Sequence, residues 1–361
     1  MKKLGDIGDV KMCRRIFSDE TSSIGDIPFF KIGSFGKEAD AFISKELYLD
    51  YRKRFSYPKK GDVLISAAGT VGRTVVFTGE DAYFQDSNIV WIDNDNANVN
   101  NDFLFYILKI VKYNTEGGTI QRLYNSILKS TKFNSPKISE QNKIYNFLNL
   151  IDDRIQTQNK IIEELKILKS TLAQKLFSQQ LRFKGDDGND FGVWEVKKLG
   201  ECLDYIQPTK YLVSSTEYDN SYKTPVLTAG KTFILGYTNE TNGIFENNLP
   251  VIIFDDFTTA TQFVDFPFKA KSSAMKILTA TKGVYIKFIF EAMQFMNYEI
   301  GGHERHWISK FAPIEILVPS IDEQTRIADF LSSIDEKIKT ENEILEQYKN
   351  QKQYLLYNLF I

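Results

Sequence analysis

The chain contains an internal repeat, and a repeat of this kind constrains the fold more than any other feature of the sequence. Residues 136–165 align without a gap to residues 319–348 at a constant offset of 183, and 14 of the 30 aligned positions are identical. Two shorter pairs of matching segments lie upstream, at 2–9 with 197–204 and at 28–33 with 225–230. The sequence therefore predicts two variable blocks, each followed by a copy of the same well-matched segment.

Each repeated segment has the apolar spacing of a long helix. Apolar residues recur at alternating intervals of four and three, which gathers them into one stripe that packs against another helix. Polar residues interrupt both stripes at equivalent positions, Gln158 and Lys169 in the first and Glu341 and Lys352 in the second, which favours a role in setting the helix register. The stripes comprise Ile144, Leu148, Ile151, Ile155 and Ile162, and Ile327, Leu331, Ile334, Ile338 and Leu345.

Two such helices in one chain bury their stripes most simply against each other. We expect an antiparallel pair related by a pseudo-twofold axis, with helices of about 60 Å for about 40 residues each and N-caps at Ser139 and Asp322. Independent coiled-coil tails that bind partner proteins are the alternative. The expected divisions are a first block at 1–135, a first helix at 136–183, a linker with the second block at 184–318, and a second helix at 319–361.

The two variable blocks combine short β-rich runs with turn signals. The clearest runs, at 61–77 and 249–266, predict hairpins within α/β domains. Outside their opening and closing segments the blocks share little sequence, whereas the helices match closely. The expected fold is therefore α/β (α+β), with two globular domains that differ in surface and are joined by two long helices packed as an antiparallel coiled coil.

Composition excludes several classes of protein. A chain of 361 residues suits two or more domains, and no apolar run approaches the roughly 20 residues of a membrane span. The N-terminus has no apolar stretch after its lysines, so we expect a cytoplasmic protein. Cys13 and Cys202 lack a CxxC partner, which favours reduced thiols over disulfides or zinc. The net charge of −2 argues weakly against nucleic-acid binding, so any DNA-binding surface must be local.

Two stretches of the first block carry candidate DNA contacts. The segment 48–62 interleaves basic residues, which neutralise phosphates, with aromatic rings. The turn 69–73 (GTVGR) is tight enough to approach a DNA backbone, and it would present Thr70 and Arg73, an arginine suited to bidentate contact with guanine. A solvated loop and an ordinary hairpin turn are the respective alternatives. The basic candidates in the first stretch are Arg52, Lys53, Arg54, Lys59 and Lys60.

The end of each block carries another candidate set. An arginine follows a Gly-Gly pair in both blocks, and Arg122 aligns with Arg305 at the offset of 183. In the second block Lys269 and Lys271 are weaker phosphate-contact candidates, with surface solubility as the alternative. We expect no metal at the two histidines because a third ligand is lacking. The set comprises Gln121, Arg122, Lys129 and Lys132, and His303, Arg305, His306 and Lys310.

Motifs for catalysis are absent from the sequence. There is no GxxxxGK[ST] phosphate-binding loop, no Asn/Asp-Pro-Pro-aromatic sequence of adenine methyltransferases, and no GxSxG or HExxH. Asp255 and Asp256 follow an apolar run, and we expect them to stabilise a turn rather than to bind Mg²⁺. The sequence therefore predicts a chain without catalytic activity.

Taken together, these motifs resemble the specificity subunits of Type I restriction-modification enzymes over nearly the whole chain. The resemblance rests on the two copies of PxxxEQxxI at 136–144 and 319–327, the FLxxID stretches, WEVKKLGE at 194–201, and GDVLIS at 61–66 with its GTVGR turn. One difference is the stretch 181–196, which precedes the second KKLG motif and has no equivalent before the first.

The resemblance implies that the blocks are target recognition domains and that the helices are conserved spacers. Each domain would read one half of a bipartite, asymmetric double-stranded DNA site, with the helices setting the unread gap. Such subunits serve phage defence without being enzymes. They recruit two adenine methyltransferase (modification) subunits that use S-adenosylmethionine, and restriction subunits that use ATP and Mg²⁺. The chain itself would bind no cofactor.

Two other functions remain open from the sequence. The chain could be a specificity subunit of another methyltransferase-dependent restriction system, and only its partner would discriminate this case. It could also be a coiled-coil scaffold whose blocks bind proteins, which the low net charge favours. Salt-dependent DNA affinity of the assembled complex would exclude the scaffold.

Overall fold

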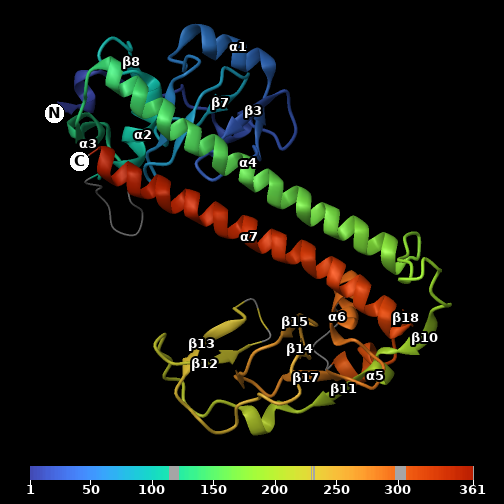
Figure 1. Ribbon diagram of the computed structural model, residues 1–361. Coiled ribbons are helices and arrows are strands. Elements are labelled where there is room, and N and C mark those ends of the chain that lie inside the picture. The colour runs from blue at the N-terminus through green and yellow to red at the C-terminus, as the bar shows by residue number, and fades with distance from the viewer. Residues whose placement is uncertain (114–121, 229, 231, 297–305, 361) are drawn as a thin grey trace. The chain divides into compact units, whose positions relative to one another are not determined.

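The computed structural model describes residues 1–113, 122–228, 230, 232–296 and 306–360 (Figure 1). The chain forms two compact units, one of Met1–Asn159 with Ile344–Ile361 and the other of Lys160–Glu343. We call these unit 1 and unit 2. Each unit contains one α/β block and parts of two long helices, α4 (Ile138–Phe177) and α7 (Ile321–Leu359). Both helices lie where the heptad pattern predicts them.

The described residues of unit 1 form three sheets. Its main sheet is antiparallel, in the order β2 (Gly8–Lys11), β8 (Ile89–Asn94), β5 (Val63–Ser66) and β6 (Thr74–Val76). A second sheet has the order β4 (Phe42–Ile43), β3 (Ile27–Phe30) and β7 (Tyr83–Phe84), with β3 parallel to β7, and β1 (Lys2–Lys3) pairs with β9 (Lys132–Phe133). The shorter helices are α1 (Lys45–Arg54), α2 (Asn101–Ile110) and α3 (Asn125–Ser130).

Unit 2 repeats this organisation. Its main sheet has the order β11 (Leu203–Ile206), β17 (Met275–Ala280), β14 (Val251–Asp255) and β15 (Thr261–Val264). The second sheet has the order β13 (Ile234–Thr238), β12 (Thr224–Leu227) and β16 (Lys269–Ala270), with β12 parallel to β16, and β10 (Glu195–Lys198) pairs with β18 (Glu315–Val318). The shorter helices are α5 (Leu199–Cys202) and α6 (Ile286–Phe295).

The repeat therefore extends into blocks whose sequences have little in common. Pro28 and Pro225, which the sequence aligns, are the second residues of the equivalent strands β3 and β12. The hairpins predicted at 61–77 and 249–266 are present as β5–β6 and β14–β15. The predicted fold class, two α/β domains with two long helices, is confirmed.

The core of each block has layers because side chains alternate across the central strand. In unit 1, Val63 and Ile65 of β5 pack in a cluster with α2, whereas Leu64 packs in a cluster with β3 and β7. In unit 2, Ile252 and Phe254 of β14 likewise pack with α6, whereas Val251 and Ile253 pack with β12 and β16. Both faces of the main sheet are thus covered, which explains why β5 and β14 read as continuous apolar runs.

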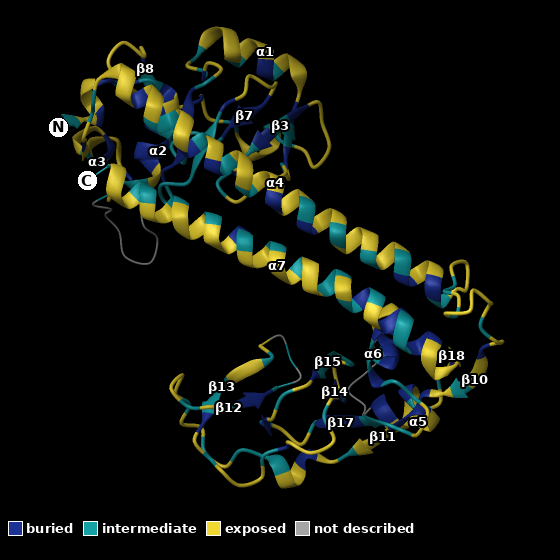
Figure 2. Ribbon diagram, viewed as in Figure 1, coloured by how far each residue is buried: buried dark blue, intermediate teal, exposed yellow. Residues whose placement is uncertain are grey.

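Within each unit, the segments of α4 and α7 run antiparallel. In unit 1, Ile144 shares a cluster with Phe360, and further along α4 Asp152 forms an ion pair with Lys352. In unit 2, Leu176 shares a cluster with Ile327, and Lys169 Nζ lies 2.6 Å from Asp335. The predicted stripe residues are all buried or half-buried. Figure 2 shows buried and intermediate residues recurring among exposed ones along both helices.

The lysines that interrupt the stripes have matching roles in the two units. Lys169 and Lys352 occupy equivalent positions in the repeat, and so do their partners Asp335 and Asp152. Each lysine therefore makes the same interhelical ion pair. The observed pairs agree with the predicted role of these positions in setting register, because a shift of one helix would leave the charges unpaired.

The repeated glutamine attaches each block to its long helix. Gln324 Nε2 donates to Pro319 O at 2.9 Å, and its Oε1 accepts from the backbone N–H of Tyr285, the N-cap of α6, at 2.8 Å. Gln141 does the same in unit 1, donating to Pro136 O and accepting from the N-cap of α2, Asn100, at 3.0 Å. Sequence reasoning used this glutamine only as a motif and missed its structural role.

The expected helix N-caps were wrong by two residues. Ser139 and Asp322 lie inside the first turns, because α4 begins at Ile138 and α7 at Ile321. The backbone carbonyl of Lys137 accepts from Gln141 N, and that of Ser320 accepts from Gln324 N, so Lys137 and Ser320 precede the helices. Ser320 Oγ also accepts weakly from Glu323 N at 3.4 Å.

Candidate nucleic-acid interface

The turn after β5 is held in a fixed conformation. Gly69 and Gly72 have φ values of +65° and +84°, which favour glycine, and a Cβ on Gly72 would lie 3.0 Å from the Tyr113 ring. The hydroxyl of Ser66 accepts from Arg73 N at 2.9 Å and donates to the carbonyl of Thr70. These contacts make the turn a rigid support for the side chains that it presents.

Two arginines are attached at this turn, and their side chains contact different residues. Arg73 is half-buried and its Nη1 donates to Phe35 O at 2.8 Å. Arg122 forms a β-bridge with Ala68 and is exposed, with Nη2 at 3.5 Å from Asn88 Oδ1. Thr70 is exposed beside them. We call Thr70, Arg73 and Arg122 the hairpin-end cluster, because all three lie at the end of β5.

The basic candidates of the segment 48–62 lie toward the start of β5, where Arg52, Lys59 and Lys60 line one pocket. Arg52, Lys53 and Arg54, predicted as phosphate contacts with a solvated loop as the alternative, form the last turn of helix α1. Lys59 and Lys60 stand just before β5, and Lys59 Nζ lies 3.3 Å from Asp93. The structure therefore does not unite the two predicted basic stretches into one surface.

Several of these cations have exposed carboxylate partners. Arg52 contacts Asp81 at 3.4 Å, Arg54 contacts Asp50 at 2.8 Å, and Lys129 contacts Asp9 at 2.6 Å. Exposed pairs contribute about 0–1 kcal/mol, so they leave these side chains able to exchange a carboxylate for a phosphate. Lys53, Lys60 and Lys132 are also exposed.

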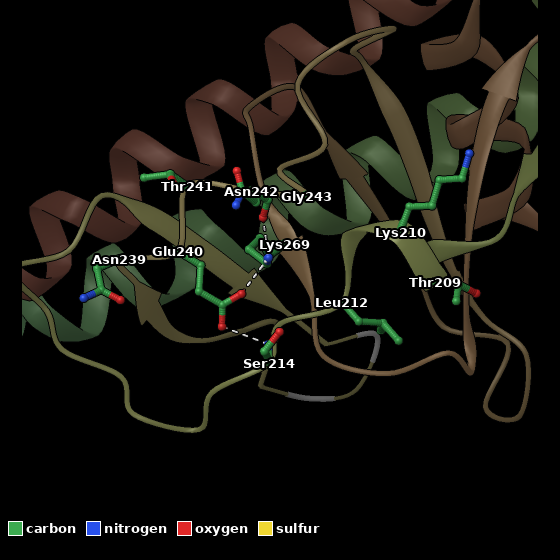
Figure 3. Close-up of a pocket in the computed structure, with 10 residues that line it drawn as sticks. All are labelled: Thr209, Lys210, Leu212, Ser214, Asn239, Glu240, Thr241, Asn242, Gly243 and Lys269. Carbon is green, nitrogen blue, oxygen red and sulfur yellow. Dashed lines mark hydrogen bonds and ion pairs between the residues drawn. The ribbon is translucent and has the colours of Figure 1, made fainter.

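Lys269 does not fit its predicted role in DNA contact. It is 3% exposed, and its amino group lies 2.7 Å from Glu240 Oε2 and donates to Asn242 O at 2.6 Å (Figure 3). The hydrogen bond from Lys269 and the backbone N–H groups of Ser214 and Ser215 lower the pKa of Glu240. Lys269 is thus a structural residue on the floor of a polar pocket of about 660 Å³.

The remaining candidates of unit 2 have mixed outcomes. His306 is completely buried, so its predicted contact with DNA does not fit the structure either. Lys310 is exposed in the π-helical turn Trp307–Phe311, and Lys271 is half-buried with Nζ 5.7 Å from the centre of the Tyr218 ring. Three further candidates, Gln121, His303 and Arg305, lie outside the described residues.

The equivalent hairpin end in unit 2 has a different chemistry. Asp255 Oδ1 accepts from the backbone N–H groups of Phe257 and Thr258, and buried Asp256 lies 3.5 Å from Lys276 Nζ, so this aspartate pair stabilises the turn. His306 N donates to Asp256 O at 3.0 Å, just as Leu123 N donates to Ala67 O in unit 1. The turn exposes Phe257 and Thr258, and Thr259 after them is half-buried. Sequence reasoning missed these residues because it searched for basic side chains.

The described residues show no sign of a metal site or of a membrane span. They contain no group of three or more histidine, cysteine or acidic side chains arranged to hold a metal ion. Among the same residues, every helix is too short or too polar to cross a membrane.

Comparison with known proteins identifies the family. The family model for the Type I restriction modification DNA specificity domain matches residues 1–167 and 192–350. A type I restriction enzyme specificity subunit sequence of Haemophilus influenzae is 53% identical over 176 residues, which cover 48% of this chain and 45% of that protein. The EcoR124I/EcoR124II specificity subunit of Escherichia coli is 52% identical over 129 residues, or 34% of this chain and 32% of that one. These matches span less than half of either relative.

A solved structure shows the same fold. The S subunit of a Type I restriction-modification system from M. genitalium matches 100% of this chain and 95% of its own, with a TM-score of 0.65 at 17% identity. The family model covers most of the sequence, and the structural match extends over all of it. The chain belongs to the Type I restriction-modification DNA specificity family.

Proposed function

We propose that the chain directs a Type I restriction-modification complex to a bipartite, asymmetric DNA site, with one half read by each unit. The observation that carries this proposal is the pair of equivalent hairpin ends on the same scaffold. Unit 1 presents Arg73 and Arg122, which suit guanine and phosphate, whereas unit 2 presents Phe257 and Thr258, which suit a thymine methyl group. Two recognition blocks with the same fold but different side chains at the equivalent hairpin ends fit two half-sites of different sequence.

In this proposal the chain is not an enzyme, and partner subunits carry out the chemistry. Adenine methylation would come from modification subunits that use S-adenosylmethionine, and cleavage from restriction subunits that use ATP and Mg²⁺. Support comes from a solved structure reported for complex assembly of the type I R-M system, which matches 98% of this chain with a TM-score of 0.55.

Exposed apolar side chains on the two long helices of unit 1 support the need for a protein partner. Phe147 and Leu150 on α4 are 46% and 52% exposed, and Tyr354 and Tyr357 on α7 are 68% and 72% exposed. Exposed large apolar side chains of this kind fit helices that a partner protein covers.

The test is methylation-site sequencing of DNA from cells that express this chain with its cognate methyltransferase subunit, compared with the methyltransferase alone. A two-part motif with a fixed unread gap, present only with this chain, is the expected result. Absence of new methylation despite a stable complex and an active methyltransferase would contradict the proposal and favour the protein scaffold.

A further inference from the structure

A buried aspartate joins two separate segments at the hairpin end of unit 2. The backbone carbonyl of Asp256 accepts from His306 N at 3.0 Å, and its Oδ1 accepts from Trp307 N at 2.9 Å. Asp256 is 1% exposed, and its other carboxylate oxygen lies 3.5 Å from Nζ of the buried Lys276. The turn after β14 and the π-helical turn Trp307–Phe311 are therefore fixed to each other.

Aromatic rings hold the π-helical turn against the main sheet. Trp307 and Phe311, its first and last residues, are buried, and their ring centres lie 5.3 Å and 4.9 Å from that of Phe254 in β14. Residues 308–310 between them are exposed. The exposed side chains thus start from a backbone that is anchored at both ends. Turns of this rare kind are frequent at functional sites.

Two apolar side chains are exposed on this joined surface. Phe257 directly follows Asp256 and is 41% exposed, and Ile308 directly follows Trp307 and is 62% exposed. Each starts one residue away from the hydrogen bond between Asp256 and Trp307. A single exposed apolar residue is common on a protein surface, whereas two beside one buried anchor bring apolar surface to one place. We call Phe257 and Ile308 the apolar pair.

The equivalent positions in unit 1 have different side chains. The hydrogen bonds that match in the two units pair Phe257 with Ala68 and Ile308 with Asn125. Unit 1 instead carries the hairpin-end cluster at this end of its main sheet, with Arg122 exposed. Equivalent backbone positions therefore present polar and cationic groups in unit 1 and apolar groups in unit 2.

We propose that the apolar pair reads thymine in the half-site of unit 2, and that Ile308 is a further specificity-determining residue. This inference rests on the proposed function and deepens it, because it adds a second segment to the hairpin end and names the group that is read. Thymine carries a methyl group in the major groove, and apolar side chains contact that methyl group. Lys310 on the same turn is exposed, so the turn also offers a cation to a phosphate.

The test compares DNA duplexes bound by the chain in complex with its cognate methyltransferase subunit. The duplexes carry the motif found by methylation-site sequencing, and deoxyuridine, which lacks the methyl group, replaces every thymidine of one half-site at a time. The parent complex should bind one of the two uridine duplexes more weakly than the thymidine duplex, by about fourfold for each methyl group contacted. This comparison uses the parent chain, so it holds whatever a substitution does to stability.

The double variant Phe257→Ala with Ile308→Asn shows which residues read the methyl group. It carries the residues of the equivalent positions in unit 1, and it should bind the thymidine duplex and that uridine duplex equally. The matched control is Val196→Asn, which removes an apolar side chain that is 63% exposed on β10 and should keep the preference of the parent chain.

Two results would overturn this inference and leave the proposed function intact. The first is sequence-specific binding by the parent complex with no loss of affinity for either uridine duplex. The second is a loss of affinity that the double variant retains in full. Equal binding of the motif and of a scrambled duplex would instead contradict the proposed function, and this inference with it.

Discussion

Replacing Gln324 by alanine should strongly destabilise unit 2. The side chain is 1% exposed, accepts from Tyr285 N, and donates to Pro319 O and Gly283 O at 2.9 Å and 3.3 Å. The alanine variant loses three hydrogen bonds and leaves buried backbone groups without partners. At about 1 kcal/mol for each bond, with more for a buried unpaired N–H group, the expected loss is about 2–4 kcal/mol.

Tryptophan fluorescence during urea unfolding measures this loss of stability for unit 2 specifically. Trp194 and Trp307 belong to unit 2 and Trp91 to unit 1, so a Trp91→Phe background reports unit 2 alone. With a urea m-value of about 2–3 kcal/mol/M for a unit of this size, the midpoint should fall by about 1 M. Gln174→Ala, an exposed glutamine on α4 in the same unit, should change stability by less than about 0.5 kcal/mol. Equal midpoints for Gln324→Ala and Gln174→Ala would refute the assigned role.

Three further predictions concern buried groups. Lys276→Met should lower the free energy of unfolding of unit 2 by about 3–5 kcal/mol, because Asp256 would keep a buried charge without its cation. An unchanged urea midpoint would contradict the ion pair. The pKa of Glu240 is lowered by Lys269 and backbone N–H groups, so its contribution to stability is present above its usual value of 4.5 and is lost as the pH falls through the lower folded-state value. The Glu240→Gln variant should therefore show a weaker pH dependence of the urea unfolding midpoint of unit 2 below about pH 4.5 than the parent chain. The same pH dependence in the variant and the parent chain would refute this. Burial raises the pKa of Cys13 to about 12 and also raises that of Cys202, so a thiol reagent at about pH 8 should label neither in the native chain and both in urea; fast native labelling would contradict the burial.

Periodicity made the helices and the repeat predictable. The stripe residues on α4 and α7 follow a heptad pattern that only a helix–helix contact satisfies, so their burial could be read from spacing alone. The aligned prolines of β3 and β12 likewise marked equivalent strands. The caps at Ser139 and Asp322 failed because the backbone enters each helix two residues earlier, a detail that side-chain preference does not determine.

The candidate interface was harder to predict because charge in a sequence carries no information about burial. Lys269 and His306 looked like surface groups, but tertiary contacts enclose both. The two basic stretches of the first block are close in sequence, yet they lie at opposite ends of β5 because the strand between them is extended. Arg122 reached the turn with Arg73 through its bridge to Ala68, a long-range pairing that no local pattern shows.

The most direct test of the central claim is the methylation motif of a chain with Arg73→Ala and Arg122→Ala, determined with the cognate methyltransferase subunit. We predict relaxed sequence preference in one half of the motif, with the other half and the gap unchanged, because each arginine–base contact contributes about 1–3 kcal/mol of discrimination. The control, Lys60→Ala with Lys132→Ala, changes two exposed cations outside the hairpin-end cluster and should leave the motif intact. An unchanged motif in the double arginine variant, or relaxation in both halves, would contradict the assignment of one half-site to each unit.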